Sequence, residues 1–380
     1  MYMLKEIIIL GDIELGGGTL TDDFISDNAL STFILSLSYK EKAIDLVLNG
    51  DTFDFLKCPY IAHGKQHFPR HITEEISLTK LSSIYNAHAK VFEALKSFLK
   101  NKLHHVYFII GNHDHDLFFH GVQQELKMML GCKTRVTFTL AYEKHGVYAE
   151  HGHQYDILNK INPNDVFLKH EGKKILKFPW VSLVVISRFL DLKEEHPFLE
   201  RIKPYPRLFE HHKPVVKKLS WRGITHFFQS LFYYPVRYYY DPTYNVPWDI
   251  VSEIAYRIRT VNWDIDKVVH VFKKEKKKLL RENKIYVFGH VHEKYVEVRK
   301  KRVIIHADTW RDEYFMDKRS KILTPKAKRY VHVTIDGEML HWDLVTYPIA
   351  RSVFHYTEVI KDEKKFLKIA AGEEGFKSGF

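Results

Sequence analysis

The sequence predicts a mixed α/β protein in which two packed β-sheets are flanked by helices. Five short apolar runs recur between the N-terminus and residue 290, and each is typical of a buried strand. A block of polar, chemically reactive residues follows each of them. Further along, Asp336-Gly337 separates two β-rich runs and predicts a tight hairpin, which suits a second sheet packed on the first.

The apolar runs are expected to form the strands that carry the functional residues. Those that precede a polar block are residues 7–10, 44–48, 106–110, 147–149 and 285–288. Because ligands in α/β sheets bind beyond the carboxyl ends of strands, the five blocks are expected to meet at one site. Helical spacing over 73–99 predicts helix packed on the sheet. The antiparallel strands are predicted at 303–305, 330–335 and 339–345.

The chain divides into a core, an insertion and a tail. Residues 1–158 and 284–358 hold all five blocks and are expected to form the core. Residues 159–283 contain none of them, and this stretch is too long for a plain loop, so we expect a mostly helical cap over the site. Residues 359–380 are rich in Lys, Glu and Gly and are expected to form a polar, frayed tail.

Three features characterise the predicted cap. An apolar run covers 178–187, and a lysine-rich helix is expected to begin after Asp264, its N-cap. We expect the aromatic residues between them to form the core of the cap or a contact in a homodimer. These aromatic residues are Phe227, Phe228, Phe232, Tyr233, Tyr234, Tyr238, Tyr239, Tyr240, Tyr244 and Trp248.

Composition narrows the class of protein. With 380 residues, 45% of them hydrophobic, the chain can bury a full core. Its cysteines, Cys58 and Cys132, are too few for a disulfide framework and fit a reducing compartment. The N-terminus lacks the pattern of a secretory signal, and the run at 178–187 is shorter than the roughly 20 residues that a membrane span needs. We therefore expect a soluble, cytoplasmic protein.

The net charge of the chain, +11, favours anionic partners such as phosphate-rich substrates, nucleic acid or acidic lipid.

The five polar blocks supply side chains that bind divalent metals. They are Gly11-Asp12-Ile13-Glu14, Gly50-Asp51-Thr52-Phe53-Asp54, Gly111-Asn112-His113-Asp114, His151-Gly152-His153 and Gly289-His290-Val291-His292. Asp, Glu, Asn and His offer the oxygen and imidazole ligands that such ions prefer. Neither a Gly-x-Ser-x-Gly elbow nor a Walker-type phosphate loop occurs, and neither cysteine precedes the loop of a cysteine-dependent phosphatase.

The order and residue types of the blocks resemble the calcineurin-like metallophosphoesterase superfamily. The resemblance implies two divalent ions bridged by Asp51. It implies that the first ion is bound by Asp12, Glu14 and His292, and the second by Asn112, His151 and His290. Hydroxide held by the ions would then attack a phosphomonoester, a phosphodiester or a pyrophosphate.

The resemblance also implies a proton donor. In the family, the histidine of the Gly-Asn-His block stands near the leaving group and pairs with the second Asp of the Gly-Asp block, which here are His113 and Asp54. A carboxylate that orients an imidazole raises its pKa and so makes it a cation that can donate a proton. His153 and His115 are the candidates for substrate contact, with a solvated loop position as the competing interpretation of His115. The stretch 306–310 is expected to pack near the site without binding metal.

Glu14 departs from the family, whose members usually carry His at this position. A carboxylate adds negative charge and a hard oxygen ligand, which shifts the preference toward Mn²⁺ or Mg²⁺. We predict Mn²⁺ as the favoured ion, with Mg²⁺, Fe²⁺ and Zn²⁺ as the other candidates. A competing interpretation is that the first metal site is degenerate and binds weakly.

The blocks do not identify the substrate. Residues 51–55 resemble the branch that contains UDP-2,3-diacylglucosamine pyrophosphohydrolases, whose helical insertion holds acyl chains. This chain is longer than those enzymes and has His113 where they typically have Arg. The resemblance favours a phosphate-containing substrate with a lipid-linked or nucleotide moiety, and the basic helix of the insertion leaves a peripheral membrane contact open.

We therefore predict a two-metal phosphoesterase. One alternative is a non-catalytic metal-binding scaffold on the same fold, which Glu14 favours and the pair of His113 and Asp54 disfavours. The other alternative is a nuclease, which requires basic residues of the insertion to line one groove into the site.

Overall fold

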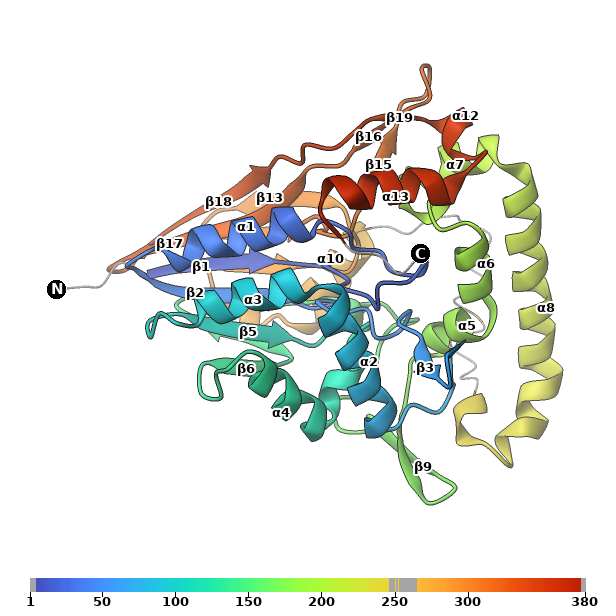
Figure 1. The fold of residues 1–380 in the computed structure, drawn as a ribbon. Helices are drawn as coiled ribbons and strands as arrows, with labels where there is room; N and C mark the ends of the chain where they lie inside the picture. The colour runs from blue at the N-terminus through green and yellow to red at the C-terminus, as the bar shows by residue number, and fades with distance from the viewer. Residues whose placement is uncertain (1–4, 246–249, 251, 253–264, 377–380) are drawn as a thin grey trace.

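The computed structural model describes residues 5–245, 250, 252 and 265–376, and two β-sheets packed face to face form its centre (Figure 1). The first sheet has the order β18-β17-β1-β2-β5-β6. Its strands are β1 (Lys5–Leu10), β2 (Ala43–Asn49), β5 (His105–Ile109), β6 (Val136–Thr139), β17 (Lys328–Asp336) and β18 (Met339–Tyr347). β1, β2, β5 and β6 are parallel to one another, and β17 pairs antiparallel with β1.

The second sheet has the order β13-β14-β12-β8-β7. Its strands are β7 (Ala141–Lys144), β8 (Val147–Glu150), β12 (Ile285–Phe288), β13 (Lys294–Arg299) and β14 (Arg302–Ala307). The two-sheet α/β fold predicted from the sequence is therefore confirmed. The hairpin of β17 and β18 turns at Asp336-Gly337, as predicted. Its predicted place in the second sheet is wrong, because β17 pairs with β1 and so extends the first sheet.

The apolar runs are continuous because both faces of their strands are buried. Ile7 and Ile9 of β1 pack between the two sheets, while Ile8 and Leu10 pack under the helices on the outer face. The helices over that face are α1 (Asp27–Ser38), α2 (Glu74–Ala87), α3 (Ala89–Phe98) and α4 (His120–Met129). The helical prediction over 73–99 is thus confirmed as two helices, the first capped by Thr73, whose side chain accepts a hydrogen bond from the Ile76 N–H.

The predicted insertion is divided between two parts of the molecule. Residues 159–245, here called the cap, contain β9 (Phe167–His170), β10 (Lys173–Leu176), α5 (Trp180–Arg188), α6 (Leu190–Glu195), η3 (Leu199–Arg201), β11 (Ile202–Lys203), α7 (Tyr205–His211), α8 (Lys213–Tyr238) and η4 (Pro242–Tyr244). In Figure 1, α5, α6 and α8 stand together beyond one end of the sheets.

The lysine-rich helix at the end of the insertion packs on the core. In α10 (Ile265–Glu275), Val268, Val269 and Phe272 are buried against Tyr148 and Tyr286 of the second sheet. α11 (Leu279–Glu282) follows it. The apolar face predicted for this helix therefore covers the outer side of the sheet, while its predicted N-cap, Asp264, lies outside the described residues.

Most of the aromatic cluster faces solvent, contrary to the prediction of a cap core. Phe232 is 72% exposed and Tyr239 90% exposed, whereas Tyr234 is buried. Phe228, Tyr233, Tyr238 and Tyr240 are also exposed, and Tyr244 is partly buried. The side chains of Phe227 and Trp248 lie outside the described residues. The homodimer contact stays a prediction.

The C-terminal segment is folded, although its composition predicted a frayed tail. α12 (Tyr356–Val359) buries Val359, α13 (Glu363–Glu373) buries Leu367, and Phe376 beyond α13 is buried with them. They pack with a smaller sheet that joins β11 to β15 (Tyr314–Met316), β16 (Ile322–Pro325) and β19 (Phe354–His355). The prediction failed because the few apolar residues of this segment recur at helical spacing, which a polar average composition conceals.

Four short elements complete the described part of the chain: β3 (Tyr60–Ala62) and β4 (Lys65–His67), which form a hairpin, and the single turns η1 (His115–Phe118) and η2 (His153–Tyr155). Among the described helices, none is long and apolar enough to cross a membrane.

Candidate active site

The five polar blocks meet where β1, β2, β5, β8 and β12 end. The turns there hold non-glycine residues in the left-handed region of φ, which few side chains adopt. The predicted ligands with positive φ are Asp12 (50°), Glu14 (58°), Asp51 (46°), His290 (73°) and His292 (59°). The concentration of strained backbone at one place is a mark of functional sites, because the surrounding fold must stabilise it.

Glycines allow the blocks to approach each other closely. A Cβ atom at Gly111 would lie 2.1 Å from Oδ1 of Asp51, and one at Gly50 would lie 2.4 Å from the ring of His151. These distances are far below van der Waals contact, so only glycine fits at either position. The glycines of the motifs thus serve the convergence of the polar side chains.

Asp51 stands between two groups of ligand atoms. One group contains Asp12, Asp51 and His151, and the other contains Glu14, Asp51 and His113; within each, the candidate ligand atoms lie within 4.8 Å of one another. Oδ2 of Asp51 is 3.1 Å from Nε2 of His151, which is also 3.0 Å from Oδ1 of Asn112. Asp51 is thus the residue that the two groups share.

The two histidines of the last block face different neighbours. Nε2 of His292 lies 3.2 Å from Oδ1 of Asp12 and 3.4 Å from Oε1 of Glu14. The ring of His290 is 5.3 Å from that of His151 between centroids, but its Nε2 is 3.2 Å from Oδ2 of Asp156. His290 therefore lies beside the other predicted ligands and has a carboxylate partner that the motifs did not reveal.

The residues present fit divalent cations. Oδ2 of Asp12 is buried and has no hydrogen-bond partner among the described residues, which leaves a carboxylate oxygen available for an ion. Burial opposes protonation of the histidines, but the nearby carboxylates outweigh it and raise the pKa of His151 to about 9 and that of His292 to about 10. The carboxylates thus favour positive charge at this point, which a divalent cation would supply in place of the protons on the imidazoles.

Glu14 is held by two buried cations that the sequence motifs did not indicate. Nζ of Lys57 is 3.0 Å from Oε2 of Glu14, 2.6 Å from Oδ2 of Asp23 and 3.2 Å from Oδ2 of Asp54. Nη1 of Arg311 is 3.6 Å from the same oxygen of Glu14. One carboxylate oxygen of Glu14 is therefore engaged by cations, and the other, Oε1, faces His292.

His113 and Asp54 form the expected pair. Nδ1 of His113 is 2.9 Å from Oδ1 of Asp54, so Nε2 of the ring takes no part in this contact. Burial lowers the pKa of His113, but Asp54, Asp51 and Glu14 outweigh burial and raise it to about 9. The pKa of Asp54 is lowered, because Lys57 and His113 outweigh the effect of its burial. The imidazole is thus a cation at neutral pH.

His115 and His153 are buried near the other site residues, and their predicted contact with substrate stays a prediction. They are 2% and 3% exposed, and their ring centroids are 6.0 Å apart. Burial is the main cause that lowers the pKa of His115 to about 3 and that of His153 well below its usual range. Both rings are therefore neutral; His115 contacts Phe178, and His153 lines a second cavity together with His151. The competing interpretation of His115 as a solvated loop position is wrong, because the residue is buried.

Other supporting residues lie in the stretch that follows β14. Oε1 of Glu313 is 3.7 Å from Nδ1 of His292, a distance within the range of an ion pair but beyond that of a hydrogen bond. Thr309 donates a hydrogen bond to the Asp12 carbonyl, and Trp310 is fully buried. Residues 306–310 pack near the site, as predicted. Glu313 and Lys57 were missed because a single charged residue a few positions outside a motif gives no periodic signal.

A cavity of about 480 Å³ extends from these residues into the cap. Asp51, Asn112, His113, His290 and His292 line its inner end. Apolar side chains of the cap line most of the rest, among them Val181, Val185, Leu192, Leu199, Leu208 and Val215. The cap therefore encloses a largely apolar space that is continuous with the polar centre.

A two-sheet fold with this constellation at its strand ends defines a class of metal-dependent phosphoesterases. Residues 6–294 match the family model of calcineurin-like phosphoesterases, and the chain belongs to that family. No curated protein matches the chain.

Three solved structures show distant similarity. A predicted phosphoesterase from Streptococcus pneumoniae is 10% identical, with 93% of this chain and 99% of that chain covered and a TM-score of 0.30. A phosphopantetheinyl hydrolase from Mycobacterium tuberculosis is 12% identical, with coverages of 81% and 90% and a TM-score of 0.30. A putative 5'-nucleotidase from Staphylococcus aureus is 12% identical, with coverages of 97% and 58% and a TM-score of 0.32.

Proposed function

We propose that this chain is a two-metal phosphoric ester hydrolase whose substrate carries an apolar group beside the scissile phosphate. The observation that carries the proposal is the position of Asp51, shared by two groups of ligand atoms at the inner end of an apolar cavity. Membership of the calcineurin-like phosphoesterase family supports the reaction class.

The proposed ligands of the two ions are Asp12, Glu14, Asp51, Asn112, His151, His290 and His292. Bound divalent ions would supply activation of water and neutralisation of the phosphoryl oxygens. Mn²⁺ remains the favoured ion, because the proposed ligands combine hard oxygens with imidazoles. Lys57 and Arg311 hold Glu14 in place and remove part of its negative charge.

His113 is proposed to protonate the leaving group. Asp54 accepts a hydrogen bond from Nδ1 and so fixes the orientation of the ring, with Nε2 as the nitrogen that donates. Against the effect of burial, the carboxylate of Asp54 raises the pKa of His113 and so favours the protonated ring that donates when the ester bond breaks. The side chain of His113 is 16% exposed, which leaves it open to a molecule in the cavity.

The lining of the cavity supports an apolar substituent on the substrate. Burying one methylene contributes about 0.8 kcal/mol, which corresponds to roughly a threefold to fourfold gain in kcat/KM for each methylene that the cavity accepts. A long alkyl phosphodiester should therefore be hydrolysed much faster than its methyl analogue. Of the two moieties that the sequence left open, a lipid-linked group and a nucleotide, the apolar lining supports the lipid-linked one.

The test compares p-nitrophenyl phosphodiesters with methyl, butyl and decyl substituents. Metal-stripped protein is assayed with added Mn²⁺, Mg²⁺ or Zn²⁺, beside Val185→Trp, which fills part of the cavity, and Phe232→Ser on the exposed face of the cap. We expect kcat/KM to rise with chain length in the parent and in Phe232→Ser, and to rise much less in Val185→Trp. Equal rates for all three esters would contradict the apolar pocket.

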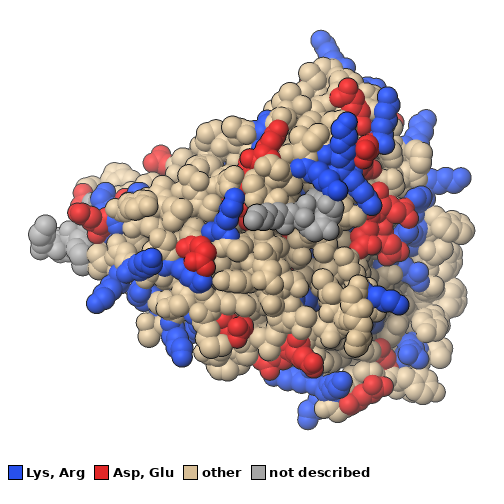
Figure 2. Space-filling model, in the orientation of Figure 1, with Lys and Arg blue, Asp and Glu red and all other residues tan. Residues whose placement is uncertain are grey.

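The second candidate is a non-catalytic scaffold, and the contacts of Glu14 with Lys57 and Arg311 favour it because they compete with an ion for the carboxylate. The absence of metal-dependent turnover on any monoester or diester would leave the scaffold ahead. A nuclease is less well supported: on the face drawn in Figure 2, the described Lys and Arg side chains lie apart and are mixed with Asp and Glu, without a single basic groove.

A further inference from the structure

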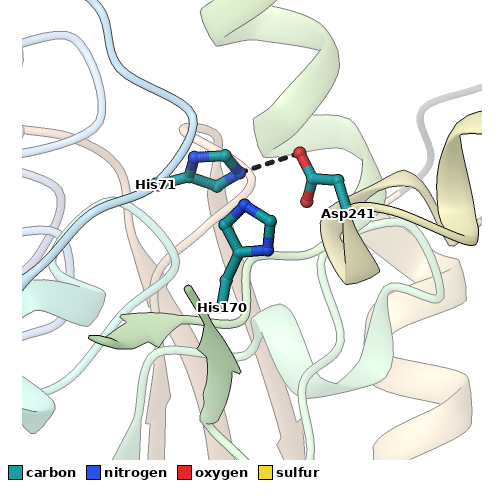
Figure 3. A group of neighbouring side chains, drawn as sticks. All are labelled: His71, His170 and Asp241. Carbon is teal, nitrogen blue, oxygen red and sulfur yellow. Dashed lines mark hydrogen bonds and ion pairs between the residues drawn. The ribbon is translucent and has the colours of Figure 1, made fainter. Parts of the chain in front are cut away.

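A second cluster of metal-binding side chains lies outside the proposed active site. His71 belongs to the loop between β4 and α2, His170 ends β9, and Asp241 follows α8 (Figure 3). Their candidate ligand atoms lie within 4.8 Å of one another. Three segments far apart in the sequence thus bring two imidazoles and one carboxylate to a single point where the cap meets the core.

The carboxylate is fixed so that one of its oxygens faces the histidines. Oδ1 of Asp241 accepts hydrogen bonds from the backbone N–H and the hydroxyl of Thr243, at 3.0 and 2.7 Å. Oδ2 is 2.8 Å from Nε2 of His71. The side chain of Asp241 is only 4% exposed. A carboxylate held in this way by its neighbours is the arrangement that orients metal ligands.

The rings of the two histidines lie close together. Their ring centroids are 4.4 Å apart, and the ring planes are tilted by 38°. In Figure 3 the ring of His71 meets Asp241 along the dashed line, and the ring of His170 lies beside that of His71. Metal–nitrogen distances of about 2.0–2.1 Å require ligand atoms somewhat over 3 Å apart, so side-chain adjustments of about 1 Å would suffice.

Other charged groups around the cluster leave room for a cation. The guanidinium of Arg70, next to His71, contacts other groups. Its Nη2 donates a hydrogen bond to the carbonyl oxygen of Thr243 at 2.6 Å, and its Cζ lies 4.0 Å from the centroid of the Tyr244 ring. Oε1 of Glu171 is 3.9 Å from Nε2 of His170. Glu171 is exposed and could supply a fourth ligand in place of water.

We propose that His71, His170 and Asp241 bind a divalent transition-metal ion, with Zn²⁺ as the preferred occupant, which fastens the end of α8 to the core. Two imidazoles and a carboxylate suit zinc better than Mg²⁺ or Ca²⁺, which prefer oxygen ligands. Because α5 to α8 line the cavity, an ion at this point would stabilise the cap over the proposed active site without touching the substrate.

The experiment measures zinc bound to the full chain after removal of metals and equilibrium dialysis against Zn²⁺. The variants are the double change His71→Ala with His170→Ala, and His67→Ala as a matched control that removes an exposed imidazole from the neighbouring hairpin. We expect the double variant to bind one equivalent of zinc less than the parent and the control to bind as the parent does. Because the change lies outside the proposed active site, hydrolysis of a small p-nitrophenyl ester with saturating Mn²⁺ should be unchanged.

A second measurement separates an ion from a simple hydrogen-bonded contact. Zn²⁺ should slow hydrogen exchange at residues 167–176 and 236–244 in the parent but not in Asp241→Asn. This variant keeps the size of the side chain, so it tests the site even if the double variant fails to fold. Equal zinc stoichiometry and equal protection in parent and variants would overturn the proposal and leave the cluster as a hydrogen-bonded contact alone.

Discussion

The core and the cap of this molecule bury opposite kinds of groups. At the ends of the core strands, buried carboxylates and histidines converge, and Lys57 and Arg311 compensate part of their charge. The cap buries an apolar cavity and exposes aromatic rings along α8. The difference supports the proposal that the core supplies the chemistry and the cap selects the substrate. Changes in the two regions should therefore have separable effects.

The largest effect is expected from Asp51→Asn. Loss of the shared carboxylate removes a charge that both proposed ions need, so kcat/KM should fall roughly 10³-fold on every ester. Steady-state kinetics and calorimetric titration with Mn²⁺ would measure activity and ion binding together. Asp336→Asn, on an exposed turn, is the control. Retention of two ions at unchanged affinity would show that Asp51 does not bridge them.

Lys57→Met should destabilise the fold by about 3–5 kcal/mol, because it leaves the buried carboxylates of Glu14, Asp23 and Asp54 without their shared cation. Lys96→Met removes a partly exposed lysine that pairs with the exposed Glu93 and should change stability by less than about 1 kcal/mol. Urea unfolding of metal-free protein gives both values. Equal stability of the two variants would contradict the role given to Lys57.

His113→Ala should reduce kcat about 10²-fold or more on an alkyl ester, whose leaving group needs a proton. On p-nitrophenyl esters, whose leaving group is stable as an anion, the loss should be small. The ratio of the two rates is the measurement, and His120→Ala, an exposed histidine of α4, is the control. An equal loss on both kinds of ester would place His113 in another role.

A rise in pH should destabilise the core, whereas a fall in pH should destabilise the cap. Burial opposes the charged form of His88, but Asp27 and Asp22 outweigh it and raise its pKa to about 10. Its contribution to stability is therefore complete below pH 6.5 and is lost as the pH rises through 10. In the cap, burial, with Arg188 and Arg70, lowers the pKa of His226 to about 4, so its contribution is present above pH 6.5 and is lost as the pH falls through 4.

Hydrogen exchange, followed peptide by peptide, would measure this difference. Alkaline pH should increase exchange in α3, and acidic pH should increase it in α8. His88→Gln and His226→Gln should each flatten the pH dependence of its own region only. A uniform loss of protection throughout the molecule would show that the core and the cap unfold together.

The smallest effect is expected on the outer face of the cap. Phe232→Ser should change the free energy of unfolding by no more than about 0.5 kcal/mol, because the ring is exposed. Phe53→Ala, in the core, should cost about 3–5 kcal/mol. Thermal unfolding at low protein concentration compares them. A large loss for Phe232→Ser would indicate that this face is covered, for instance by a second copy of the chain.

The sequence by itself determined the parts of the structure that depend on local pattern. The buried strands and the helices over 73–99 follow from apolar runs and from periodicity. The convergence of the five blocks follows because each lies at the carboxyl end of a strand, so neighbouring strands bring distant residues together. Asp12, Asp51, His151 and His292 could be placed in one site for this reason.

Only the tertiary structure decided what depends on contacts between distant segments. The pairing of β17 with β1, the packing of α10 on the second sheet and the burial of His115 are set by which surfaces meet. The same holds for Lys57 beside Glu14, and for the meeting of His71, His170 and Asp241. A lone charged or histidine residue has no pattern of its own, so its partner becomes visible only when the chain has folded.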